Sequence, residues 1–165
     1  MQAPDSRPPA HGKGFVAAAV SAPGLSAISF ILGSLVPALL SEAGLSGLGT
    51  ALFNLIFIVL IATIWGAVPS FVFGGLVLAV IRSLSWRRPP GNVVYLIGGV
   101  VAAGLYLLAG LWIARISAGA AMFFAPWAAP DLWPGNSTEA ALMIASLLLS
   151  GAGAGLIYAG LAKRG

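Results

Sequence analysis

The chain has 165 residues, of which 59% are hydrophobic and only 7% are charged, whereas a soluble domain has about 25% charged residues. A membrane protein is therefore expected. The formal net charge of +4 argues against a nucleic-acid partner, because the basic residues lie at the ends of apolar segments and form no patch. With no cysteine and one histidine, His11, the sequence predicts no cofactor, no metal site and no thiol or histidine catalysis.

The amino-terminal residues 1–14 are polar and rich in Pro and Gly, so we expect a disordered cytoplasmic tail. Residues 15–165 are then expected to form a single transmembrane domain. The first crossing is predicted over residues 15–40, with Pro23 as a possible bend. A cleaved signal peptide is a weaker alternative, because the apolar run continues far past any such cleavage site.

The second crossing is predicted over residues 49–83, within a stretch that is free of charge from Glu42 to Arg82. As one helix it would be about 52 Å long, against a hydrocarbon core of about 30 Å. Pro69 lies in its middle and cannot donate a helical hydrogen bond. Two interpretations follow: one long helix kinked near Pro69, or two short helices that fold back there. We favour the long helix, because a split would place the basic residues after Ser83 outside.

The third and fourth crossings are predicted over residues 93–113 and 138–162. The connection over residues 116–137 contains four Phe or Trp residues and three prolines, so it is too short and too broken to span a membrane. Aromatic residues favour the membrane interface, and we expect this segment to lie along the outer surface. Simple anchoring is the favoured interpretation, and a lid or docking loop is the alternative.

The distribution of charge predicts that both termini lie inside. Seven of the eight basic residues then fall on the inner side, and Arg115 alone lies outside. The inner residues are Arg7, Lys13, Arg82, Arg87, Arg88, Lys163 and Arg164. This bias is typical of a multi-pass protein of the bacterial inner membrane, although the same rule holds for eukaryotic plasma membranes.

Small side chains recur every four residues on two of the predicted helices, which lets another helix approach closely. The residues are Ala62, Gly66, Ser70 and Gly74 on the second crossing and Gly151, Gly155 and Ala159 on the fourth. These positions are predicted to pack helices together. They also favour association with other membrane proteins or with further copies of this chain.

Polar groups within the crossings are few, and none is acidic or basic, which argues against proton relays and ion-coupled transport. Ser34, Asn54 and Ser146 lie at broadly similar depths from the outer side, with Ser146 somewhat deeper. They predict either a small polar pocket or, as the favoured interpretation, ordinary hydrogen bonding between helices, with the Ser hydroxyls also bonding back to their own helix. Arg115 and Glu139 are predicted to pair at the outer rim; this pair, or snorkelling of Arg115, is favoured over the alternative of an anion-attracting mouth.

The fold class predicted is an all-α bundle of four transmembrane helices. The function favoured is non-catalytic: a small subunit or assembly protein that binds lipid or other membrane proteins. The alternative is a component of a small oligomeric transporter or channel, in which Ser34 and Asn54 line a water-accessible path. A lipid-modifying enzyme ranks last, because few ionisable residues lie near one interface.

Overall fold

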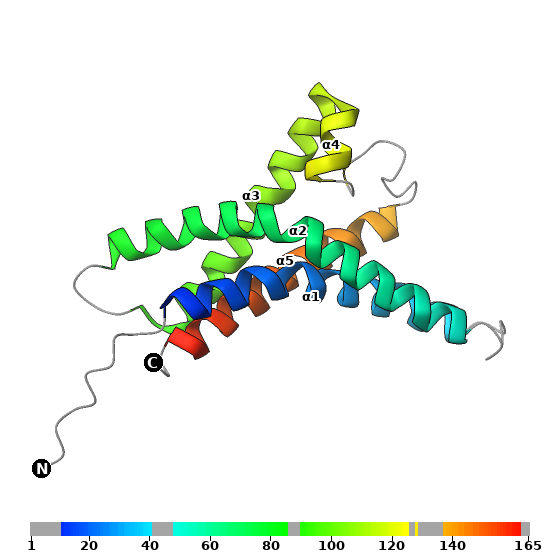
Figure 1. The fold of residues 1–165 in the computed structure, drawn as a ribbon, viewed down its shortest axis with the longest axis horizontal. Coiled ribbons are helices and arrows are strands. Elements are labelled where there is room, and N and C mark those ends of the chain that lie inside the picture. Colours follow the sequence, from blue (N-terminus) through cyan, green and yellow to red (C-terminus); the bar gives the residue numbers. More distant parts are fainter. Residues whose placement is uncertain (1–10, 41–47, 86–89, 126–127, 129–136, 163–165) are drawn as a thin grey trace, which may run out of the picture.

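The computed structural model describes residues 11–40, 48–85, 90–125, 128 and 137–162, and all of its regular elements there are helices (Figure 1). The five helices of the described residues are α1 (His11–Leu40), α2 (Leu48–Leu84), α3 (Asn92–Ile116), α4 (Ala118–Phe124) and α5 (Ser137–Ala162). Among these residues, four helices contain segments long and apolar enough to span a membrane: Gly12–Gly33, Val59–Leu84, Asn92–Ile116 and Ser137–Ala162. The predicted four-helix membrane bundle is confirmed at this level.

Helix α1 begins at His11, four residues before the predicted start of the first crossing. The sequence around Gly12 and Gly14 resembles a loop by composition, but Gly14 is buried against α5. A Cβ at Gly14 would lie 3.4 Å from the Leu161 Cβ and from the carbonyl oxygen of Tyr158. The end of the predicted tail is therefore helical because it packs on the bundle. The rest of that tail, residues 1–10, lies outside the described residues.

Helix α2 is continuous over 37 residues and passes through Pro69, so the interpretation as two short helices is wrong. Figure 1 shows that α2 changes direction around its middle, as predicted from Pro69. A proline within a helix removes one backbone hydrogen bond, and its ring displaces the carbonyl one turn earlier, which bends the axis.

The four spanning helices form a ring in the order α1, α2, α3 and α5, in which each packs against its two neighbours. Between α1 and α2 the contact is close at Gly66, where an added Cβ would lie 2.5 Å from the Cβ of Pro23. Because residue 66 is a glycine, the Pro23 ring can occupy the space that a side chain there would fill.

The contact between α3 and α5 is a seam of glycines, at which the two backbones touch. A Cβ added to Gly99 would overlap the carbonyl oxygen of Gly151, and one added to Gly155 would overlap that of Tyr95. One turn beyond Gly155, Ala159 is fully buried. Glycine allows two helices to approach until their backbones meet, which is the usual role of such patterns in membranes.

Helix α4 folds back along α3 (Figure 1). The hydroxyl of Ser117 accepts a hydrogen bond of 3.2 Å from the backbone N–H of Ala120 and caps the short helix. The hydroxyl of Tyr106 donates a 3.0 Å hydrogen bond to the carbonyl oxygen of Phe124. Tyr106 lies ten residues before the end of α3, or about 15 Å along it. The start of the predicted interfacial segment therefore returns toward the middle of the bundle.

Candidate functional site

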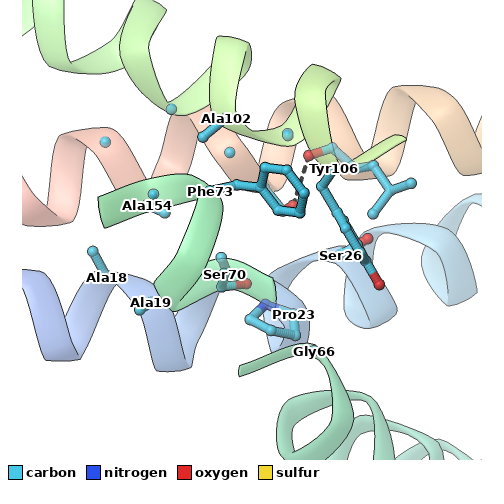
Figure 2. A pocket seen from close by; sticks show the side chains of 18 of the residues that line it. Ala18, Ala19, Pro23, Ser26, Gly66, Ser70, Phe73, Ala102, Tyr106 and Ala154 are labelled. Atoms are coloured by element: carbon cyan, nitrogen blue, oxygen red, sulfur yellow. Dashed lines mark hydrogen bonds between the residues drawn. The ribbon is translucent and has the colours of Figure 1, made fainter. Parts of the chain in front are cut away.

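A cavity of about 690 Å³ lies between the spanning helices, and all four of them line it (Figure 2). This volume falls within the range of about 300–1,000 Å³ that is usual for small-molecule sites. Many of the lining residues are Ala or Gly, such as Ala18, Ala102 and Gly98, and most of the others are aromatic or aliphatic. Where helices present small residues to a shared centre, the side chains do not fill the space between them, and a cavity results.

One end of the cavity is lined by a group of larger side chains, one from each spanning helix. We call this group the end cluster: Phe15, Leu78, Tyr95 and Tyr158. The rings of Tyr95 and Tyr158 pack with their centroids 5.0 Å apart and an interplanar angle of 60°. These contacts surround the buried Ala18 and Ala154 and fix the ends of the four helices relative to one another.

The lining of the cavity extends far along the helices. On α1 it runs from Phe15 to Phe30, and on α5 from Tyr158 to Met143, which is about 22 Å along either helix. A lining of this length suits a chain-like molecule.

Hydroxyl groups from all four spanning helices line the cavity within a band of about 6 Å along the helices. We call these residues the hydroxyl belt: Ser26 on α1, Ser70 on α2, Tyr106 on α3, and Ser146 and Ser150 on α5. Along its own helix, each belt residue lies eight to twelve residues from the end cluster, or about 12–18 Å. Because half of the hydrocarbon core is about 15 Å, the belt lies near the middle of a membrane whose surface is level with the end cluster.

The belt hydroxyls differ in their hydrogen bonds. Ser146 and Ser150 are buried and donate to their own helix, to the carbonyl oxygens of Met143 (2.8 Å) and Leu147 (2.7 Å). Ser26 and Ser70 are half-buried, and within the described part of the chain neither hydroxyl has a hydrogen-bond partner. Figure 2 shows both serines and Tyr106 among the labelled lining residues.

The residues predicted as a polar pocket are only partly described. Ser146 lies in the cavity wall, whereas the side chains of Ser34 and Asn54 lie outside the described residues. Ser26 and Tyr106 were not predicted. Tyr106 could have been found from its position, because it lies near the middle of the third crossing, away from the membrane interfaces where Tyr is usual.

The other predicted residues either contact a neighbouring helix, line the cavity, or lie exposed at a helix end. Ala62, Gly66, Ser70 and Gly74 face the cavity from α2, and Gly151 and Gly155 meet both the cavity and α3. Arg115 ends α3 and Glu139 lies in the first turn of α5, and both side chains are exposed. Their ion pair stays a prediction.

The described residues that line the cavity include no Asp, Glu, His, Lys or Arg. Acid–base and nucleophilic catalysis need such groups or an activated hydroxyl beside one. The chemistry that this lining offers is the burial of apolar surface and a few hydrogen bonds to neutral groups.

The fold defines a multi-pass integral membrane protein with four apolar spanning helices. No family model, curated protein or solved structure matches the chain.

Proposed function

We propose that this chain is a non-catalytic integral membrane protein that binds a lipid in the cavity between its four spanning helices. The observation that carries the proposal is the cavity itself: about 690 Å³, lined mostly by apolar residues, and extended along the helices over about 22 Å.

The wall chemistry supports a lipid over a polar solute. An ion or a charged metabolite would leave water for an apolar wall with no charged partner among the described lining residues. A hydrocarbon chain needs no charged partner, and it would gain close contact with the apolar lining residues. The bilayer around the bundle supplies such chains.

The proposal is tested by filling the cavity. Ala102 lines the cavity, whereas its neighbour Val101 is 47% exposed on the outer side of α3. Ala102→Leu is expected to reduce the lipid that stays bound through purification, measured by native mass spectrometry, because the larger side chain occupies the site. Val101→Leu is the matched control and should retain lipid as the natural chain does. Equal retention by both variants would contradict the proposal.

The orientation that we propose places both termini on the inner side of a bacterial inner membrane. Lys13 near the start of α1 and Arg82 near the end of α2 are exposed, and Arg115 is exposed at the end of α3. In this orientation Lys13 and Arg82 lie on the inner side and Arg115 lies on the outer side, in agreement with an excess of positive charge inside.

A second candidate function is that of a small subunit or assembly protein. The first half of α2 exposes several large apolar side chains, including Phe53 (72%), Ile56 (61%) and Ile64 (70%). This surface suits another membrane helix as well as lipid. The mass of the protein in mild detergent separates the possibilities. A foreign chain that co-purifies supports a subunit, a homo-oligomer supports the transporter or channel alternative, and a monomer argues against both.

A further inference from the structure

We propose that the lipid in the cavity is a long-chain, uncharged molecule whose polar group is a hydroxyl or a carbonyl, and that the hydroxyl belt holds this group. The inference rests on the proposed function of the cavity and adds the chemical class of the ligand.

The depth of the belt carries the first step. A phospholipid places its charged headgroup at the membrane surface, about 15 Å from the bilayer centre. A phospholipid chain in the cavity would therefore put only hydrocarbon beside the belt. Ser26 and Ser70 are half-buried at this depth and have no hydrogen-bond partner in the described part of the chain, which is unfavourable beside hydrocarbon, so these two serines fit a ligand with a polar group at the same depth.

Ordinary hydrogen bonding within the bundle accounts for Ser146 and Ser150, which bond to their own helix. It does not account for Ser26 and Ser70, which lie on two neighbouring helices and have no hydrogen-bond partner in the described part of the chain. These two hydroxyls line the cavity with their hydrogen-bonding capacity unused.

The hydrogen-bond donors and acceptors of the belt serines restrict the chemical identity of the ligand's polar group. Ser26 and Ser70 can each donate a hydrogen bond, whereas Ser146 and Ser150 have used their protons and retain acceptor lone pairs. A ligand hydroxyl matches both pairs, and a ligand carbonyl matches the donors on α1 and α2. A charged group has no counter-ion among the described lining residues and would be excluded.

Photo-crosslinking can test this class directly. The full chain is placed in phosphatidylcholine nanodiscs and labelled with a diazirine derivative of an 18-carbon alcohol. Oleyl alcohol, a long-chain methyl ketone, octadecene and octadecyl sulfate then compete for the site. We expect the alcohol to compete about fivefold better than octadecene, the factor that corresponds to one net hydrogen bond, and the sulfate to compete no better than octadecene. If the ketone competes as well as the alcohol, a carbonyl group is sufficient for binding at the belt.

Variants connect the preference to the belt. The double variant Ser26→Ala/Ser70→Ala should still be labelled but should lose most of the preference for the ketone over octadecene. Ser83→Ala is the matched control, because Ser83 is exposed near the end of α2, lies outside the cavity and bonds to the carbonyl oxygen of Val80 at 2.8 Å. It should leave the preference unchanged.

Each result bears on the inference. Equal competition by alcohol, ketone and octadecene, or strong competition by the sulfate, overturns it, as does an unchanged preference in the Ser26/Ser70 variant. The proposed function is tested separately. If Ala102→Leu abolishes labelling and Val101→Leu does not, lipid binding in the cavity is supported even when the probe shows no preference for a polar group. If Ala102→Leu leaves the labelling unchanged, both the lipid site and the inferred class of ligand are contradicted.

Discussion

Replacing single glycines by alanine tests whether the seam between α3 and α5 holds the cavity in place. At Gly155 an added Cβ would overlap the carbonyl oxygen of Tyr95, which belongs to the backbone and cannot turn aside. The two helices would have to separate, and overpacking of this kind destabilises by about 1–3 kcal/mol. Alanine also favours the helix by about 1 kcal/mol over glycine. The net expectation is that Gly155→Ala lowers the free energy of unfolding by about 0–2 kcal/mol.

The same helix provides the control. Gly160 has no atom within 4 Å of its added Cβ, so Gly160→Ala should gain the helix propensity alone and stabilise by up to about 1 kcal/mol. Gly99→Ala and Gly104→Ala form the same comparison on α3, because Gly99 meets Gly151 and Gly104 meets nothing. The free energies are measured by reversible unfolding in mixed detergent micelles. If Gly155→Ala and Gly160→Ala change stability by the same amount, the backbone contact does not exist in the protein.

Three further predictions follow from the described contacts. Tyr106→Phe should remove the hydrogen bond to Phe124 and increase amide exchange in α4 by about fivefold, corresponding to about 1 kcal/mol; exchange at the natural rate would show that the bond does not hold α4. Because the chain has no cysteine, Leu84→Cys and Ile116→Cys can be labelled singly, and an impermeant maleimide applied from outside should modify residue 116 and not residue 84; the reverse pattern would invert the proposed orientation. Arg115→Glu should lower stability by less than about 1 kcal/mol, and adding Glu139→Arg should restore it, whereas no effect of Arg115→Glu argues against the predicted rim pair.

The sequence was sufficient to predict the spanning helices because their signals are local. The uncharged run around Pro69 and the basic residues that follow it favoured one long α2, and the structure has one. The start of α1 was placed too late, because Gly12 and Gly14 have a loop-like composition. Their helical state depends on α5, which is distant in sequence.

The cavity could not be predicted, because a ridge of small residues has two opposite outcomes. Gly155 contacts the backbone of α3 at a seam, whereas Gly74, in a similar pattern on α2, meets only the ring of Phe15, at 3.6 Å from an added Cβ. Which outcome occurs depends on the side chains of the opposing helices. The fold-back of α4 was equally hidden, because it depends on a hydrogen bond between residues that are 18 positions apart.

The most direct test of lipid binding is native mass spectrometry of the natural chain beside Ala102→Leu and Val101→Leu, all released gently from membranes. The cavity account predicts a bound lipid on the natural chain and on Val101→Leu, and its loss from Ala102→Leu, with unfolding midpoints showing that all three remain folded. A folded Ala102→Leu protein that carries the same lipid in the same amount would contradict the claim that the cavity is the binding site.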